Sequence, residues 1–372
     1  MNLGQQLRDF KGSMSPRIKE WRFMWARIRK TPLAFAGFAI VIFFIAIAVL
    51  APVLAPVPAD SVNAFNIPTD TEIYGLTPNP VGPTLRHIFG TTDEQYDLYY
   101  ACIWGTITAF RTGLMVVIIS LVIGVAIGSV AAFYGGLLDE ALMRFTDIII
   151  AFPGLVLAMA LVIAFPAVIG LNLSFLFLVI FALISFLLFA VKPSKVLLLA
   201  IQIMLAISLI SFLYFPLNLD LSLSRLDKVL IAITLVGWPG YTRVIRGEIL
   251  RVKNEDYVEA SRASGSSDFG IMLRHIWPNT IYPIVIVATL DIGSIVLSAA
   301  ALSFIGLGAD SNYADWGQII QRSRVWISRP TELAANIHTF MIPGFFITFF
   351  VMGWNLLGDA LRDVLDPTLR RR

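Results

Sequence analysis

The stretch from Glu255 to Asn279, EDYVEASRASGSSDFGIMLRHIWPN, is a polar, charged island between long apolar runs. Gly265 is suited to end a first helix, because glycine adopts the left-handed conformation readily, and Ser266-Ser267-Asp268 can cap a second. We expect Val258, Ala260, Ala263 and Ser264 on one side of the first helix, and Glu255, Glu259 and Arg262 elsewhere. The second helix should end at Pro278. A hairpin of this kind between two membrane spans is predicted to contact a partner.

The composition of the whole chain indicates a polytopic membrane protein. Of its 372 residues, 57% are hydrophobic and only 14% are charged, with a mean hydropathy of +0.78; soluble domains carry about 25% charged residues. Basic residues crowd the region before Leu33, which places the N-terminus in the cytoplasm by the positive-inside rule and does not resemble a cleaved signal peptide. Cys102 is the only cysteine and the three histidines are scattered, so neither an intrachain disulfide nor a metal site is expected.

Apolar runs predict about eight membrane-spanning helices, since roughly 20 apolar residues cross a bilayer. We predict a polar turn at 135–147 and a helix break at Pro166, Gly170 and Asn172. Gly124 and Gly128 are spaced for close helix packing, and Trp316 and Trp326 are candidate interface aromatics. The predicted spans are residues 33–51, 112–134, 148–169, 173–191, 196–219, 229–242 (extended from near Leu226 past Arg243 and Arg246), 281–307 and 333–358.

The island resembles the EAA loop of permeases in binding-protein-dependent ATP-binding-cassette (ABC) importers. Glu259, Ala260, Gly265, Ile276 and Pro278 carry the pattern, with Ser261 where the third motif residue is usually alanine. Further stretches are similar to the C-type subunit of the dipeptide/oligopeptide/nickel permease family. They are residues 27–58, VGWPGYTRVIRG (236–247), ALSFIGLG (301–308) with Trp316-Gly317, and NLLGDALRDVLDP (355–367).

This resemblance implies an all-α fold, the type I ABC importer transmembrane domain, with a six-helix family core and two inserted helices. The expected organisation is a cytoplasmic segment 1–32, a first transmembrane helix 33–55, an external segment 56–108, a permease domain 109–358 and a cytoplasmic tail 359–372. Within the permease domain we expect the inserted helix pair at 171–225 and the coupling loop at 255–278. The family pattern G-T-D-x-x-G-R-D is altered here, because residues 90–97 read GTTDEQYD.

The chain holds no G-x-x-x-x-G-K-[ST] phosphate-binding loop. No cofactor is expected in it, and ATP and Mg²⁺ would be bound by partner subunits. The resemblance implies a non-catalytic pore subunit in a prokaryotic inner membrane, with both termini cytoplasmic. Its implied partners are a second permease, two ABC ATPases, an external solute-binding protein and membrane lipid; nucleic acid is not among them. The expected ATPase-coupling residues are Glu255, Tyr257, Glu259, Ala260, Arg262, Ala263, Gly265 and Asp268.

Asp291 is the one acidic residue inside a predicted span. It follows Pro278 by 13 residues, about 20 Å along a helix, which puts it near mid-membrane, where a charge costs about 3 kcal/mol on insertion scales. Asp291 therefore either contacts a substrate amine in the pathway or makes a polar contact between helices. Di- and oligopeptides are the expected substrates, and oligosaccharides or nickel are alternatives. A self-sufficient secondary transporter would need more intramembrane ionisable residues or inverted repeats, and an intramembrane hydrolase would need a partner for His338.

Overall fold

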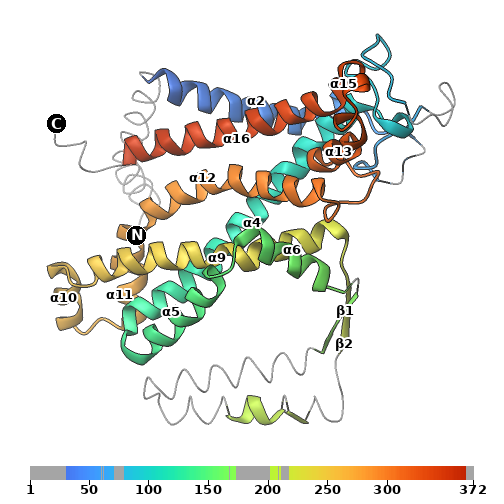
Figure 1. Ribbon diagram of the computed structural model, residues 1–372. Helices are drawn as coiled ribbons and strands as arrows, with labels where there is room; N and C mark the ends of the chain where they lie inside the picture. Colours follow the sequence, from blue (N-terminus) through green and yellow to red (C-terminus); the bar gives the residue numbers. More distant parts are fainter. Residues whose placement is uncertain are drawn as a thin grey trace, which may run out of the picture. The chain divides into compact units, whose positions relative to one another are not determined.

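The computed structural model describes residues 31–59, 61, 63–70, 79–166, 168–172, 202–207, 209–210 and 218–365. Within them the chain is built almost entirely of helices (Figure 1). The longer helices are α2 (Pro32–Leu54), α4 (Leu98–Tyr134), α5 (Gly136–Ile150), α6 (Gly154–Ala164), α9 (Arg225–Val252), α12 (Trp277–Phe304) and α16 (His338–Leu365). The shorter ones are η1 (Asp93–Gln95), α10 (Asp256–Ala263), α11 (Asp268–Ile271), the π-helix η2 (Met272–Ile276), α13 (Trp316–Arg322), α14 (Arg324–Ile327) and α15 (Pro330–Asn336).

The apolar helices confirm the predicted all-α membrane fold, although the count of eight spans is not confirmed. Among the described residues, α2, α4, the continuous helix 268–304 and α16 are long and apolar enough to cross a membrane. The pair α5–α6 would make a fifth span if its two halves count as one, despite a bend of 88°. The predicted spans 173–191 and 196–219 fall mostly outside the described residues.

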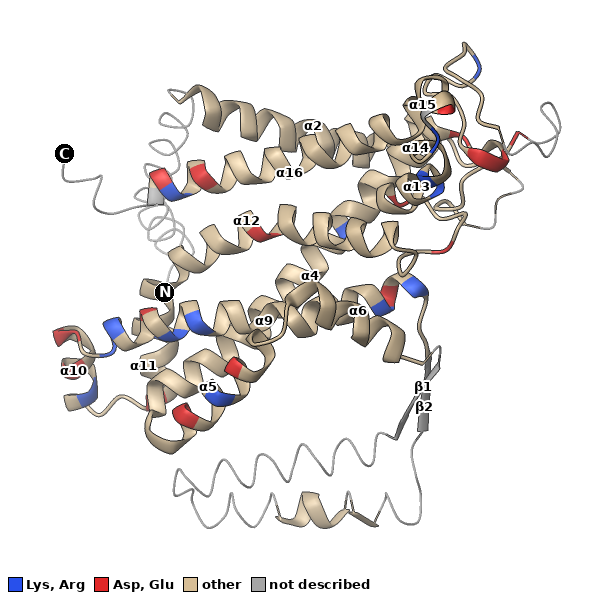
Figure 2. Cartoon of the chain, in the orientation of Figure 1, with Lys and Arg blue, Asp and Glu red and all other residues tan. Residues whose placement is uncertain are grey.

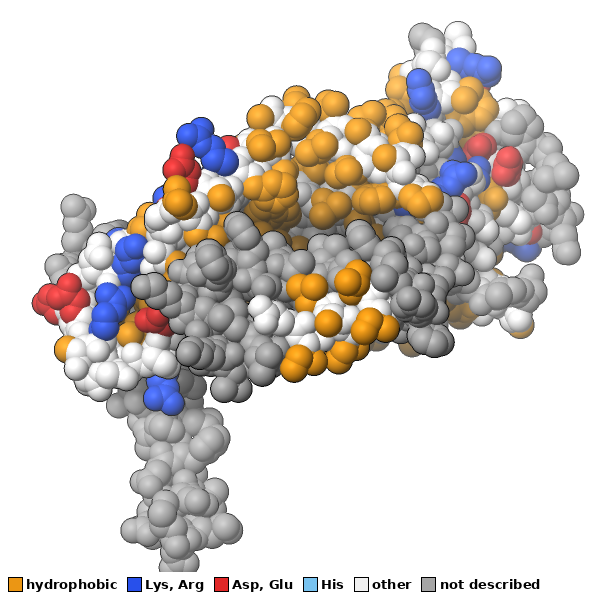
Figure 3. Space-filling view, turned by 90° about the horizontal axis from the view of Figure 1, so that it is seen from below, with side chains coloured by type: hydrophobic (Ala, Val, Ile, Leu, Met, Phe, Trp, Pro, Cys, Tyr) orange, Lys and Arg blue, Asp and Glu red, His pale blue; other side chains and the backbone are white. Residues whose placement is uncertain are grey.

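Charged residues lie mainly at the two ends of the helical bundle, and the helices between these ends are mainly apolar. Charged residues gather at the end that carries α10 and α11 and at the opposite end around α13 to α15, whereas α2, α4 and α12 are largely uncharged between them (Figure 2). Hydrophobic side chains make up most of the described surface between the charged ends in Figure 3. Exposed apolar surface of this extent is expected where side chains meet lipid or another subunit.

The predicted polar turn at 135–147 is wrong, because these residues form helix α5. Their charges are compensated by α9: Arg246 makes a two-pronged ion pair with Asp139, and Arg243 lies 2.7 Å from Asp147. Paired in this way, Asp139 can lie partly buried on a helix, whereas Asp147 stays exposed. The predicted span 148–169 is also interrupted, since α5 and α6 meet at the break 151–153, where Pro153 disfavours helical geometry in the preceding residue.

Residues 161–228 form a compact unit of their own. The helix break predicted around Pro166, Gly170 and Asn172 is confirmed, but the chain continues there as a strand. β1 (Val168–Asn172) pairs antiparallel with β2 (Asn218–Ser222), with Val168 opposite Ser222. This two-stranded ladder is the departure from the predicted all-α architecture in the described part of the chain.

An aromatic cluster holds α2, α4, α13 and α16 together. The rings of Phe44 and Phe350 lie 6.0 and 5.7 Å from that of Trp316, and the Trp316 indole donates a hydrogen bond to the carbonyl of Cys102 (3.0 Å). Trp316 and Trp326 are only 2% and 5% exposed. The prediction that they are interface aromatics is therefore wrong: their indoles fill the interior, where the Nε1–H of Trp316 has a carbonyl partner.

Glycines bring α4 and α9 into close contact, as the spacing of Gly124 and Gly128 predicts. A β-carbon on Gly124 would lie 2.6 Å from that of Tyr241 and 2.8 Å from the Trp238 carbonyl oxygen, and one on Gly128 would lie 2.6 Å from the Thr242 carbonyl oxygen. Neither helix backbone can move away without losing its packing, so the small residues set the separation of the two helices.

Alanine at Gly124 is expected to lower the thermal unfolding temperature of the detergent-solubilised protein by several degrees, because overpacking costs about 1–3 kcal/mol. The matched control is Gly247→Ala on α9, where an added β-carbon meets nothing within 4 Å. The control should be neutral or stabilising by about 0.5–1 kcal/mol, the gain of alanine over glycine in a helix. Equal melting temperatures for the two variants would contradict the packing role of Gly124.

Candidate functional site

The hairpin, residues 255–276, consists of two short helices joined by a glycine turn. Gly265 has a φ of +84°, in the left-handed region, and its N–H donates to the Arg262 carbonyl (3.0 Å). The Ser267 hydroxyl then accepts the N–H of Gly270 (3.2 Å), which caps α11. The helix stop and the new N-cap predicted from the sequence are both confirmed.

The inner side of the hairpin is apolar, but it is not the face predicted. Val258, Ile271 and Ile276 are fully buried, and on α10 the residue that accompanies Val258 inside is Ser261. The predicted companions Ala260, Ala263 and Ser264 are exposed. The reason is the helical period: residues three apart share a face, whereas residues two apart do not.

The outer side of the hairpin presents all the residues that the sequence singles out for coupling. Each of the following is exposed: Glu255, Tyr257, Glu259, Ala260, Arg262, Ala263, Gly265 and Asp268. Sequence reasoning missed Phe269, whose side chain is 71% exposed beside the glycine turn, and Leu273, at 40%. The available signal was an aromatic residue directly after an N-cap in a polar loop. Large apolar side chains exposed among charges are typical of a protein–protein contact.

Both legs of the hairpin are tied to the end of α4. The Lys253 ammonium, at the end of α9, donates to the carbonyl of Ala132 (2.8 Å), and the Trp277 indole, at the start of α12, donates to the hydroxyl of Ser129 (3.0 Å). The π-helix η2 joins α11 to α12 without a loop, so the prediction that the second helix ends at Pro278 is wrong. A force on the hairpin would therefore reach α4, α9 and α12 through direct hydrogen bonds and continuous helix.

Asp291 lies in the middle of α12 and is half-buried. The hydroxyl of Tyr241 on α9 lies near this carboxylate but forms no hydrogen bond with any described group, and the Ser294 hydroxyl donates to the Asp291 backbone carbonyl (3.0 Å). The neighbouring Ile292 and Gly293 are buried against the rest of the bundle. Asp291 thus lies near a polar group of a neighbouring helix and also keeps some accessible surface.

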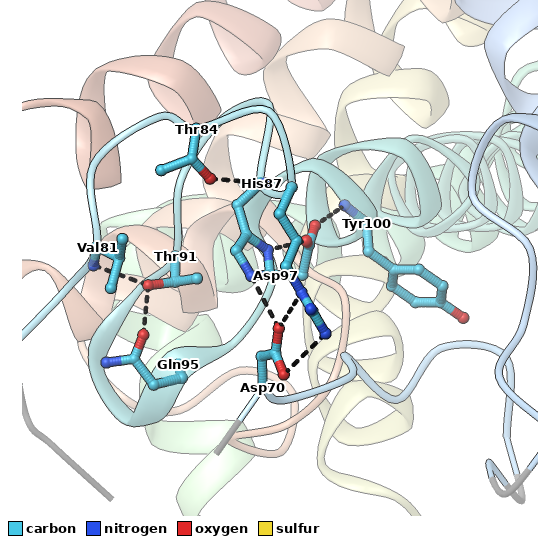
Figure 4. Close-up of polar contacts among 9 residues, drawn as sticks. Asp70, Val81, Thr84, His87, Thr91, Gln95, Asp97 and Tyr100 are labelled. Carbon is cyan, nitrogen blue, oxygen red and sulfur yellow. Dashed lines mark hydrogen bonds and ion pairs between the residues drawn. The ribbon is translucent and has the colours of Figure 1, made fainter. Parts of the chain in front are cut away.

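At the opposite end of the bundle, the segments before α4 are held by a buried histidine (Figure 4). The two ring nitrogens of His87 lie 2.7 Å from the Asp97 carboxylate and 3.2 Å from that of Asp70. Asp70 also forms an ion pair with Arg86 at 2.6 Å. Asp97 in turn caps α4 by accepting the N–H of Tyr100 (2.7 Å). The segment 63–70 is therefore fastened to the start of α4.

The backbone of the altered motif 90–97 adopts an unusual conformation. Glu94 and Gln95 have φ values of 55° and 60°, in the left-handed region that favours glycine. Gln95 stands at the glycine position of the G-T-D-x-x-G-R-D pattern, and its buried side chain donates to the Asn79 carbonyl (2.8 Å) and accepts from the Thr91 hydroxyl (2.8 Å). These bonds offset the cost of the left-handed conformation, which is on the order of 1–2 kcal/mol for a residue with a β-carbon.

The motif ALSFIGLG (301–308) covers the last residues of α12 and the turn that follows this helix. Gly306 ends α12 with a φ of +94°. A β-carbon on Gly317 would lie 2.5 Å from the Ala300 carbonyl oxygen and 2.8 Å from the Ser303 β-carbon. The glycines of this motif and of Trp316-Gly317 therefore allow α13 to lie directly against α12.

Two known protein families match different parts of this chain. Residues 124–371 match the family described as the binding-protein-dependent transport system inner membrane component, and residues 19–71 match the N-terminal transmembrane domain of oligopeptide transport permease C. The dipeptide transport system permease protein DppC of Alkalihalophilus pseudofirmus is 30% identical over 95% of this chain and 91% of its own length.

Two further relatives are also named as transport system permease proteins. The glutathione transport system permease protein GsiD of Escherichia coli is 30% identical over 94% of this chain and 91% of its own. The DppC protein of Bacillus subtilis is 27% identical over 96% of this chain and 88% of its own. The chain accordingly belongs to the inner membrane component family of binding-protein-dependent transport systems, as a non-catalytic, multi-pass permease subunit of the C type.

Proposed function

We propose that this permease imports di- or oligopeptides, driven by separate ATPase subunits that bind the hairpin 255–276. The relatives named for dipeptide and glutathione transport support a peptide substrate. The observation that carries the coupling role is the exposed outer side of the hairpin, where acidic, basic and apolar side chains stand together on a rigid turn. An oligosaccharide or nickel remains the alternative cargo; calorimetry of the accompanying binding protein with dipeptides, oligosaccharides and Ni²⁺ would decide between them.

Coupling would proceed by rigid-body displacement. When the ATPase pair closes on ATP, the hairpin moves with it and transmits the motion to α4 through the hydrogen bonds of Lys253 and Trp277. We place the hairpin and both termini on the cytoplasmic side and the segments before α4 outside. A second permease subunit would complete the pathway by covering part of the exposed apolar surface. The unit 161–228 is proposed to contain the inserted helix pair.

The test of assembly is copurification: the permease, a second permease and two ATPase subunits should form one complex in detergent. ATP hydrolysis by this complex in liposomes should rise when the binding protein and a dipeptide are added outside. A permease that takes up peptide without the ATPase subunits would contradict the proposal and favour a secondary transporter.

Asp291 is proposed to line the pathway and to contact the amino group of the peptide. Exchange for asparagine keeps the size of the side chain and removes its charge, so the melting temperature should stay unchanged. Uptake of a dipeptide with a free amino group is expected to fall about tenfold, the equivalent of 1.4 kcal/mol, while an N-acetylated dipeptide should be transported equally by both forms. Unchanged uptake of the free dipeptide would leave Asp291 as a helix contact only.

A further inference from the structure

Helices α12 and α16 lie side by side and run antiparallel through the bundle (Figure 1). A β-carbon on Gly293 of α12 would lie 3.3 Å from the Val351 α-carbon of α16, and one on Gly358 of α16 would lie 2.5 Å from the Leu290 δ-carbon of α12. Both helices belong to segments that are long and apolar enough to cross a membrane. The close contact between them therefore fixes which residues of the two helices lie at the same depth.

Helix α4 covers one side of this pair. A β-carbon on Gly113 of α4 would lie 2.9 Å from the Ile292 γ-carbon of α12, and the ring of Phe110 lies 5.1 Å from that of Phe350 on α16. Ile292 and Phe350 are only 6% and 1% exposed. Near the middle of both helices, the residues on the side turned away from α4 are exposed instead.

Five polar side chains lie on this second side, and together we call them the polar face: Asp291, Ser294 and Ser298 on α12, and Thr348 and Asn355 on α16. Within each helix they are three, four or seven positions apart, which is the spacing of residues on one helix face. Ser294, Thr348 and Asn355 are exposed, and the other two are partly exposed. With a rise of about 1.5 Å per residue, the contacts between the helices put Asp291 level with Asn355, and Ser298 level with Thr348.

The exposed surfaces of α2 and α4 have a different composition. Every exposed residue of α2 is apolar, and so is every exposed residue of α4 between positions 112 and 133. The serines of α4, Ser120 and Ser129, are buried. Because a polar group in an apolar medium without a hydrogen-bond partner costs about 2–7 kcal/mol, contact with lipid suits α2 and α4 but not the polar face. The polar face needs water or a polar ligand.

The polar face has hydrogen-bonding capacity to offer such a ligand. Each of its three hydroxyls donates to a carbonyl of its own helix at 2.8–3.0 Å, so each hydroxyl oxygen can still accept a hydrogen bond. Within the described part of the chain, no hydrogen bond of the Asn355 amide is observed. Met341 and Met352, which are 40% and 36% exposed, share this face of α16. A carboxylate, an amide and flexible apolar side chains are thus presented together.

We propose that the polar face is the hydrated wall that this permease contributes to the peptide pathway, and that Asn355 pairs with the main-chain amide of the peptide while Asp291 contacts its amino group. The inference rests on the proposed function and extends it to the recognition of the main chain. An amino group followed by a peptide bond is common to all dipeptides, whatever their side chains. Methionine adapts to ligands of different shape, so Met341 and Met352 would accommodate the variable side chains.

The first test is cysteine labelling of the complete complex in nanodiscs, without nucleotide or peptide. Cys102 is the only natural cysteine and is fully buried, so the wild type should not react with water-soluble methanethiosulfonates. The variants are Ser294→Cys, Thr348→Cys and Asn355→Cys. Each should react at least about tenfold faster than Ile42→Cys, because the reactive thiolate forms in water and not in lipid. Ile42 is the matched control, since it is 47% exposed near the middle of α2.

The charge of Asp291 gives this labelling a second readout. At Ser294→Cys, one helical turn from Asp291, a cationic trimethylammonium reagent should react about tenfold faster than an anionic sulfonate reagent, relative to their rates with a free thiol. Asp291→Asn in the same variant should remove the preference.

The second test is uptake into liposomes that contain the complete complex and ATP, with the accompanying binding protein outside. Asn355→Leu should lower the uptake of dialanine and of diphenylalanine by the same factor, about tenfold, because both share the main chain. Asn355→Gln keeps the amide and should recover part of this loss. Met352→Ala should lower the uptake of diphenylalanine only.

Labelling of all three cysteines as slow as that of Ile42→Cys would overturn the proposal, because lipid or an apolar helix of the second permease would then cover the polar face. Equal uptake of both dipeptides by wild type and Asn355→Leu would overturn the role of Asn355. Fast labelling in a complex that carries no dipeptide would support the hydrated wall and contradict the proposed cargo, so the two failures can be told apart.

Discussion

Proline at Gly265 combined with lysine at Glu259 is expected to abolish ATP-driven uptake and to prevent the ATPase subunits from copurifying with the permease. Proline fixes φ near about −65° and has no N–H. Gly265 needs a φ of +84°, and its N–H is bonded to the Arg262 carbonyl. The turn between α10 and α11 would therefore open, and the exposed residues on its two sides would lose their relative positions.

Glu259→Lys is expected to weaken binding of the ATPase without changing the fold of the hairpin. Glu259 is exposed, and no ion pair to it is observed among the described residues, so its charge reversal should leave the hairpin intact and still weaken its contact with the ATPase. Each single variant should reduce uptake, with proline the more severe. Glu140→Lys provides the control, since Glu140 is 62% exposed on α5 at the same end of the bundle. Full ATPase copurification with the double variant would refute the coupling role.

Arg246→Ala is expected to destabilise the protein by about 2–3 kcal/mol, because it leaves the carboxylate of Asp139 partly buried without its partner. Both guanidinium contacts are 2.7 Å long, and the Asp139 side chain is only 16% exposed. The loss should be visible as a lower melting temperature in detergent and as faster proteolysis of α5. Asp139→Asn in the Arg246→Ala background should recover part of the lost stability, since the uncompensated charge is then gone.

Arg243→Ala is the matched control on the same helix. Its ion pair to Asp147 is equally short, at 2.7 Å, but both side chains are more than half exposed. An exposed pair contributes about 0–1 kcal/mol, so this variant should melt close to the wild type. If both arginine variants destabilise the protein equally, burial is not what distinguishes the two pairs.

The turn and the helix cap of the hairpin were predictable because their signals are local. A glycine with a positive φ and a serine cap act within a few residues, and they lie where the sequence places them. The helix from Arg225 past Arg243 and Arg246 was predicted by extending the apolar run 229–242 at both ends, although α9 is not among the described helices apolar enough to cross a membrane.

The wrong predictions concern residues whose contacts lie far away in the sequence. The acidic residues of α5 suggested a turn because their arginines lie about 100 residues further along the chain. Trp316 suggested a membrane interface, yet it is buried among rings from α2 and α16. The ion pair of Arg322 with Asp93, a residue of the altered motif 90–97, could not be predicted either, because the two residues lie 229 positions apart in the sequence.

The π-helix 272–276 sets a rotational register between the hairpin and the bundle. A π-turn holds one residue more than an α-turn, and each residue of an α-helix turns the chain by about 100°. Deleting one residue here would restore regular α-geometry while swinging Glu259 and its neighbours around the axis of α12, away from the direction they now face. Hairpins exchanged between relatives would therefore fit a foreign ATPase only if this five-residue segment travels with them.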